Sequence, residues 1–159
     1  MNLKKLIVLL TFTMPLSVYV KAQTDVYYTN KSTRNLQTQA DSIKLLFQQQ
    51  GFSTIKEKAI VMESQYEFPV ILPLTDGTWY RVVFIGDFSS RLYEVRMFDW
   101  NEKQVVYQKK MWGDVDGNVI SYDFIPRFSE YYMIKPLQIN KHRKTVDGYV
   151  LLFKKTIKP

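Results

Sequence analysis

The sequence contains no cysteine and only one histidine, His142, among 159 residues. The lack of cysteine excludes disulfide bonds, thiol catalysis, thiolate metal sites and anchoring through a lipid-modified cysteine. Without a second histidine or a G-x-S-x-G pattern, neither the common nucleophilic arrangements nor a zinc site can be assembled. His142 lies among charged neighbours, which is typical of a solvated loop. We therefore expect no enzymatic activity and no cofactor.

Long apolar runs are also scarce, and the one at the amino terminus has the features of a secretory signal. Lys4 and Lys5 precede apolar residues that continue to Val20, and small residues suited to cleavage end at Ala22. The run is short for a spanning helix and is broken by Pro15. We expect residues 1–22 to be a bacterial signal peptide, no transmembrane segment after its removal, and a periplasmic or secreted protein.

The formal net charge is +7, and it falls to +4 without residues 1–22, because 19 basic and 15 acidic residues remain. Part of this excess lies in residues 141–144 and in three lysines near the carboxyl terminus. These cations could contact anionic envelope surfaces or acidic glycans, or form a solvated loop and a frayed end. Export argues against nucleic acid as a partner.

The composition, 46% hydrophobic and 15% aromatic, supports one core of ordinary size. We expect a flexible lead over residues 23–32 and a single domain over residues 33–159.

The amino-terminal part of this domain is expected to form an amphipathic helix over residues 34–50. Its apolar side chains recur at spacings of four, three and four residues: Leu36, Ala40, Ile43 and Phe47. Ser32 or Thr33 is a candidate cap for its start, and Gly51 suits the left-handed position after its end.

The rest of the domain is expected to be an antiparallel β-sandwich of seven or eight strands. Over residues 79–134, runs rich in Val, Ile, Tyr and Phe alternate with turn residues about every ten positions. Within one run, Tyr93, Val95 and Met97 share a face, and Glu94 and Arg96 share the other, so one face is expected to be buried.

The flanking segments complete the expected sheets. Pro69 and Pro73 cannot donate ladder hydrogen bonds, so their segment is expected at a sheet edge. Residues 141–147 are expected to form a basic loop, Asp147 and Gly148 a turn, and residues 149–157 the closing strand.

A candidate calcium site lies in the segment 114–118. Asp114, Asp116 and Asn118 place side-chain oxygens at alternate positions around a glycine, as several calcium loops do. The glycine falls at the fourth position instead of the sixth, and the twelfth position is Ile125 instead of glutamate. Asp-Gly between two β runs is also the common signature of a hairpin turn, which is the alternative interpretation.

Trp100 and Trp112 are candidate ligand-binding residues, because both lie in or beside expected turns, where a core role is harder to assign. Exposed aromatic rings on a sandwich form stacking platforms for sugar rings, although most aromatic residues of an all-β protein pack in the core. Carboxylate pairs such as Glu94 and Asp123 leave a hydrolase open, since glycosidases need only two carboxylates. A domain with 15 acidic residues offers such pairs by chance.

Three segments carry a resemblance to a known family. They are residues 74–80 (LTDGTWY), residues 95–99 (VRMFD), and residues 120–126 (ISYDFIP) followed by Tyr131 and Tyr132. Their spacing over residues 66–156 resembles that of small exported β-sandwich domains related to the pre-peptidase carboxy-terminal family; Phe98 replaces the usual tyrosine, and Ser129-Glu130 the frequent Ser-Gly. The resemblance implies a jelly-roll-like accessory module without catalytic residues, of which some relatives bind calcium or polysaccharide.

These features predict an exported, non-catalytic binding or structural module of the bacterial cell envelope, whose partner is an envelope protein or a cell-surface glycan. The alternative is a carbohydrate-binding module that uses exposed aromatic residues, and a further alternative is a carboxylate-based hydrolase.

Overall fold

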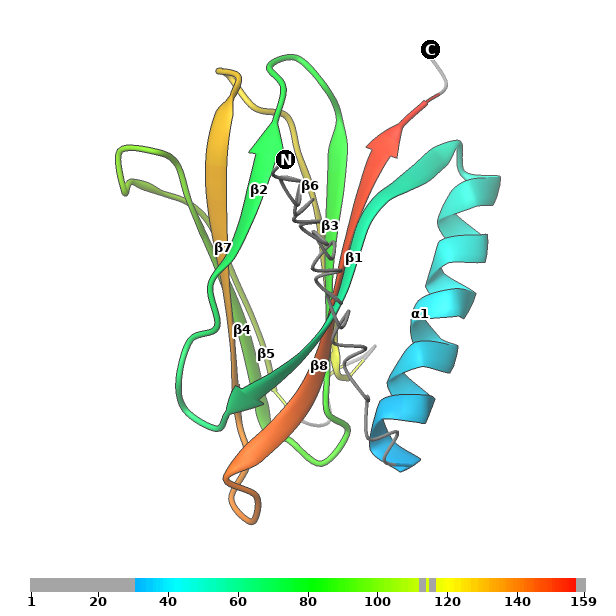
Figure 1. Ribbon diagram of the computed structural model, residues 1–159, viewed down its shortest axis with the longest axis vertical. Coiled ribbons are helices and arrows are strands. Elements are labelled where there is room, and N and C mark those ends of the chain that lie inside the picture. Colours follow the sequence, from blue (N-terminus) through cyan, green and yellow to red (C-terminus); the bar gives the residue numbers. More distant parts are fainter. Residues whose placement is uncertain (1–30, 112–113, 115–116, 157–159) are drawn as a thin grey trace, which may run out of the picture.

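The computed structural model describes residues 31–111, 114 and 117–156, with side chains from residue 35 onward, and these form one helix and two facing sheets (Figure 1). The elements are α1 (Lys31–Gln49), β1 (Phe52–Glu63), β2 (Val70–Leu74), β3 (Tyr80–Gly86), β4 (Leu92–Phe98), β5 (Gln104–Met111), β6 (Val119–Phe124), β7 (Glu130–Ile139) and β8 (Thr145–Lys155).

The strand order is that of an eight-stranded jelly roll. One antiparallel sheet has the order β1-β8-β3-β6 and the other β2-β7-β4-β5, so the chain passes repeatedly between the layers. This confirms the expected antiparallel sandwich with an amino-terminal helix. β2, which contains Pro73, is an edge strand, as its missing ladder donor requires.

The core lies between the two sheets and follows the pleat of the strands. Tyr93, Val95 and Met97 are buried there, as their alternation predicts. Residues from the opposite sheet, including Val82 and Phe84 of β3, complete the same cluster. The domain therefore has the single inter-sheet core that its composition indicates.

The interpretation of Asp147 and Gly148 as a turn was wrong. Both residues lie inside β8, which begins at Thr145 and pairs with β1 and β3. A Cβ at Gly148 would lie 3.0 Å from the ring of Phe84 and 3.2 Å from the side chain of Ile60. The absence of a side chain at Gly148 thus lets Phe84 and Ile60 pack closely against the backbone of β8. Close packing of this kind is, like a bulge, a common reason for glycine within a strand.

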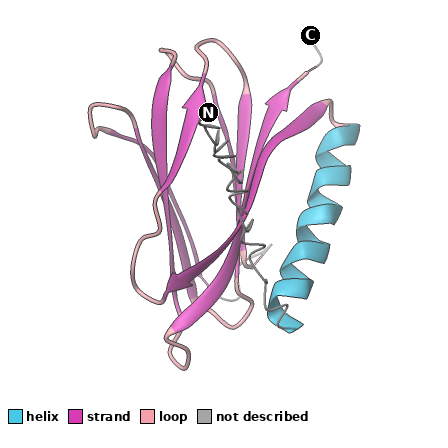
Figure 2. Ribbon diagram, in the orientation of Figure 1, coloured by secondary structure: helices cyan, strands magenta, loops and turns pink. Residues whose placement is uncertain are grey.

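The helix α1 packs on the outer face of the β1-β8-β3-β6 sheet only (Figure 2). Leu36, Ala40 and Phe47 form a second buried cluster with side chains from β3 and β8. The helix begins at Lys31, three residues before its expected start, so Ser32 and Thr33 lie within it instead of capping it. Gly51 follows its end with φ 78°, as predicted.

A buried polar network joins the loops at the lower end of the sandwich in Figure 1. Its centre is the fully buried side chain of Gln138, whose Oε1 accepts hydrogen bonds from Asp87 N (2.9 Å) and Ser90 Oγ (3.1 Å). The Nε2 of Gln138 donates to the carbonyl of Asp147 (2.8 Å). Arg143 donates to the buried carboxylate of Asp87 (2.7 Å), which ties in the β7–β8 loop. Polar groups here are satisfied internally, as burial demands.

Two buried tyrosines predict how stability depends on alkaline pH. Burial, with a smaller effect of Asp87, raises the pKa of Tyr93 from 10.0 to about 12, and burial also raises the pKa of Tyr122. The unfolded state loses these protons near pH 10, whereas the folded state retains them, so the free energy of unfolding should fall as the pH rises from about 10 towards 12. Urea unfolding across this range should show a shallower decline for Tyr93→Phe, and an identical decline would contradict the assignment.

Candidate functional site

A cleft formed by connections between strands is the first candidate site, and these connections lie at the upper end of the sandwich in Figure 1. It lies between the β4–β5 turn and the β6–β7 loop and has a volume of about 540 Å³, within the usual range of ligand sites. Its wall combines ionisable and aromatic side chains, including Asp99, Lys103, Arg127, Phe128, Glu130 and Tyr132.

Two exposed aromatic rings belong to residues that directly adjoin, along the chain, residues lining this cleft. Trp100 is 69% exposed and Tyr131 is 56% exposed, and their ring centroids lie 6.1 Å apart with a tilt of 48°. The contact joins the β4–β5 turn to the outer face of β7. Rings of this size usually bury most of their surface, so a paired and exposed set is a candidate contact surface for a ligand.

The turn that carries Trp100 is held by its own hydrogen bonds. Asp99 Oδ1 accepts from the backbone N of Asn101 (3.0 Å) and of Lys103 (2.9 Å). The backbone N of Asp99 donates to the carbonyl of Lys103 (3.0 Å), and Glu102 takes the left-handed conformation with φ 60°. Trp100 is therefore exposed on a defined turn, which lowers the entropy cost of binding.

The hydroxyl group of Tyr132, which lines the cleft, lies near two carboxylates. The pKa of Tyr132 is raised first by burial, then by the nearby carboxylates of Glu130 and Asp99. Its hydroxyl also donates to the carbonyl of Phe128 (3.4 Å). With Lys103 and Arg127 in the same wall, the cleft offers both acceptors and donors, as recognition of a hydroxyl-rich ligand requires.

The outer face of the β2-β7-β4-β5 sheet, here called the open face, is the second candidate. The helix covers the opposite side of the sandwich and leaves this sheet uncovered among the described elements (Figure 2). Strand alternation places apolar side chains on the open face from all four strands: Ile71, Tyr131, Met133, Leu137, Phe98 and Tyr107.

A network of ion pairs lies between these apolar residues. Arg96 pairs with Glu67 (3.3 Å) and Glu94 (3.2 Å), Lys109 pairs with Glu94 (3.5 Å), and Lys135 pairs with Glu67 (3.7 Å). The same cations approach rings, since Arg96 lies 5.8 Å from the Tyr107 centroid and Lys135 lies 4.8 Å from that of Phe98. The side chains of the open face thus restrict one another before any partner binds.

The structure places the proposed calcium ligands as follows. Asp114 is exposed, and its Oδ2 accepts a hydrogen bond from the backbone N of Met111 (2.7 Å). Asn118 is buried, its Oδ1 accepts from Gln39 (3.2 Å), and its Nδ2 donates to the carbonyl of Gly86 (2.8 Å). Asp116 lies outside the described residues. In the described part of the chain, no group of three or more acidic, histidine or cysteine side chains is placed to hold a metal ion.

The other predicted candidates are not brought together. Trp100 pairs with Tyr131, which was not predicted as a ligand-binding residue, and Trp112 lies outside the described residues. Glu94 belongs to the open face, whereas Asp123 lies on β6 of the other sheet and holds Arg81 through two hydrogen bonds (2.6 and 2.8 Å). The two carboxylates therefore lie on opposite outer faces of the sandwich and cannot act together. His142 lies in the exposed β7–β8 loop, as expected.

Comparisons with known proteins do not assign the chain to a family. Neither the models of known protein families nor the curated proteins gave a match. Over the residues that the structure describes, no helix combines the length and the apolar character needed to cross a bilayer.

Proposed function

We propose that this protein is an exported, non-catalytic binding module of the bacterial cell envelope, periplasmic or secreted, that binds a protein component of the envelope through its open face. The observation that carries the proposal is the asymmetry of the sandwich. The helix α1 covers β1 and β8 of one sheet, while the outer face of the other sheet presents aromatic, methionine and arginine side chains. An accessory role of this kind also agrees with the resemblance to pre-peptidase carboxy-terminal domains.

The composition of the open face supports a protein partner. Aromatic residues, methionine and arginine are enriched in protein interfaces. Met133 and Phe98 are paired across β7 and β4, and Arg96 and Lys135 form the adjacent row. Because the ion pairs with Glu67 and Glu94 already restrict these cations, little side-chain entropy is lost on association.

Site-specific photo-crosslinking in cells that naturally produce the protein tests this proposal. A photoreactive phenylalanine analogue at Met133 or Tyr107 should give a discrete adduct of higher mass. The same analogue at Leu45, an exposed residue on α1, is the matched control and should give none. Absence of adducts from the open face, or equal adducts from all three positions, contradicts a protein contact there.

A carbohydrate-binding module is the second candidate function, and the exposed Trp100–Tyr131 pair favours it. The pair supplies an apolar stacking surface, and the adjacent carboxylates, cations and phenol supply hydrogen-bonding groups. Both features are needed because a sugar ring has apolar faces and polar edges.

Affinity electrophoresis in gels that contain cell-wall polysaccharides tests the second candidate. Trp100→Ala and Tyr131→Ala should each weaken retention about tenfold or more, equivalent to a loss of about 1.4 kcal/mol. Tyr66→Ala is the matched control, because Tyr66 is similarly exposed, at 64%, on the distant β1–β2 connection. Unchanged retention of Trp100→Ala, or no retention of the wild-type protein, removes this candidate.

A further inference from the structure

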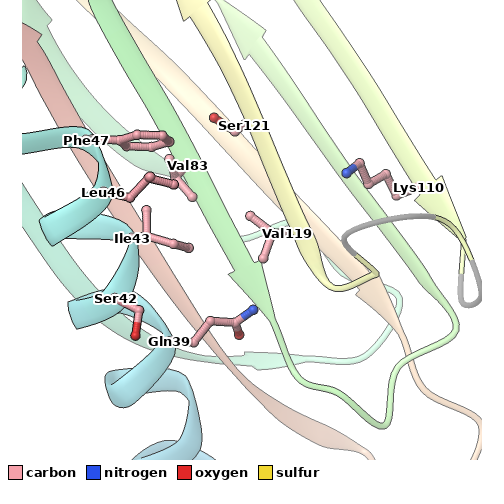
Figure 3. A pocket seen from close by; sticks show the side chains of 9 residues that line it. All are labelled: Gln39, Ser42, Ile43, Leu46, Phe47, Val83, Lys110, Val119 and Ser121. Carbon is pink, nitrogen blue, oxygen red and sulfur yellow. The ribbon is translucent and has the colours of Figure 1, made fainter. Parts of the chain in front are cut away.

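A groove separates α1 from the edge of the sheet on which it packs. The helix contacts β1 and β8 extensively and β3 much less, so the outer face beside β6 is left uncovered. The groove has a volume of about 470 Å³ (Figure 3). Its apolar wall is formed by Ile43, Leu46 and Phe47 of the helix, Val83 of β3 and Val119 of β6.

Polar contacts hold both ends of this groove. At the end nearer the helix start, the amides of Gln39 and Asn118 exchange two hydrogen bonds (3.2 and 3.0 Å). Beyond Phe47, the guanidinium of Arg81 lies 4.7 Å from the Phe47 ring centroid and is fixed to Asp123. These contacts set the distance between helix and sheet, so the groove is preformed in the absence of a ligand.

The groove has one charged lining residue among those described. Lys110 reaches it from β5 of the opposite sheet, and its amino group points towards the groove (Figure 3). Among the described residues, the remaining polar lining consists of Gln39, Ser42 and Ser121, and it includes no carboxylate. Mostly apolar walls with a few placed polar groups are the usual construction of a small-molecule site.

We propose that this groove binds an anionic single-chain amphiphile of the fatty-acid class. The alkyl chain would lie against Ile43, Leu46 and Val119, where it would cover Leu46, a residue that is 50% exposed. Removing apolar surface of this kind from water favours binding. The carboxylate of the ligand would lie towards Lys110. This lysine already interacts with another group of the protein, and its ammonium group would contact the ligand in addition. This site is separate from the open face and from the upper cleft.

Isothermal titration calorimetry with dodecanoate, below its micelle concentration, tests the proposal on the mature protein. Saturable binding with a single site is expected. Dodecyltrimethylammonium, which has the same chain and the opposite charge, should bind at least about tenfold more weakly, because Lys110 repels its head group. Equal binding of the two amphiphiles, or no saturable binding of dodecanoate, overturns the proposal.

Four variants assign any binding to the groove. Ser121→Trp fills the groove from an exposed position on β6 and should abolish dodecanoate binding, and Leu46→Glu tests the opposite wall by the same readout. Lys110→Gln should lower the affinity for dodecanoate about tenfold, and it should not lower the affinity for dodecyltrimethylammonium. Leu45→Gln is the matched control, because Leu45 is 63% exposed beside Leu46 but does not line the groove, and its affinity should be unchanged. Full affinity in either folded wall variant overturns the assignment.

Discussion

Replacing Gln138 with leucine is expected to lower the free energy of unfolding by about 3 kcal/mol or more, because it removes three hydrogen bonds to buried polar groups. The amide of Gln138 satisfies the backbone N of Asp87, the hydroxyl of Ser90 and the carbonyl of Asp147 at distances of 2.8 to 3.1 Å. Leucine fills similar space but replaces none of these hydrogen bonds. Equilibrium unfolding in urea measures the loss.

Gln104→Leu provides the matched control for this substitution. Gln104 is exposed at the start of β5, so the same chemical change there should alter stability by less than about 0.5 kcal/mol. A loss below about 1 kcal/mol for Gln138→Leu would show that the lower-end network contributes much less than its burial indicates.

Gly86→Ala should be the second strongly destabilising change, with an expected loss of about 3 kcal/mol. A Cβ at this position would lie 2.4 Å and 2.5 Å from two ring atoms of Tyr93. The ring cannot swing aside cheaply, because the single proton of its hydroxyl is shared between the carbonyls of Asp87 (2.8 Å) and Ser90 (2.9 Å). Within a strand, alanine is normally more stabilising than glycine by up to about 1 kcal/mol. The steric overlap with Tyr93 is therefore what makes this substitution destabilising.

Gly77→Ala separates this overlap from the general effect of losing a glycine. Gly77 has φ 64° and open space around its Cβ position, so only the backbone conformation opposes alanine, at a cost of about 1 kcal/mol. Urea unfolding of both variants gives the comparison. Equal losses at the two glycines would contradict the close approach of Tyr93.

The sequence predicted the features that depend on neighbours along the chain. The alternation of Tyr93, Val95 and Met97 correctly predicted a buried face, and the spacing of Leu36, Ala40 and Phe47 predicted the packed side of the helix. The same local reasoning failed at Asp147 and Gly148. A dipeptide that favours a turn continues as strand there, because β8 pairs on both sides and the ring of Phe84 lies over the glycine.

The candidate sites required contacts between distant segments. Trp100 was correctly expected at a turn, but its contact with Tyr131 could not be predicted, because the two residues are joined by the pairing of β4 with β7. The groove beside α1 depends on which strands the helix covers, and periodicity identifies the buried side of a helix without specifying its direction across a sheet. Asn118, a candidate calcium ligand, accepts a hydrogen bond from Gln39 across 79 positions of the chain, a contact that no local pattern could indicate.

The strand order also determines when this domain can fold. β8, the last strand along the chain, lies inside its sheet between β1 and β3, and β7 is likewise an inner strand of the other sheet. A growing polypeptide without residues 145–155 cannot join β1 to β3, and one without residues 130–139 cannot join β2 to β4, so each layer waits for a strand from the later part of the domain. Such non-local pairing slows folding. Under the export proposed above, a chain that is slow to fold would remain unfolded longer, which is the state in which a chain can be threaded across a membrane.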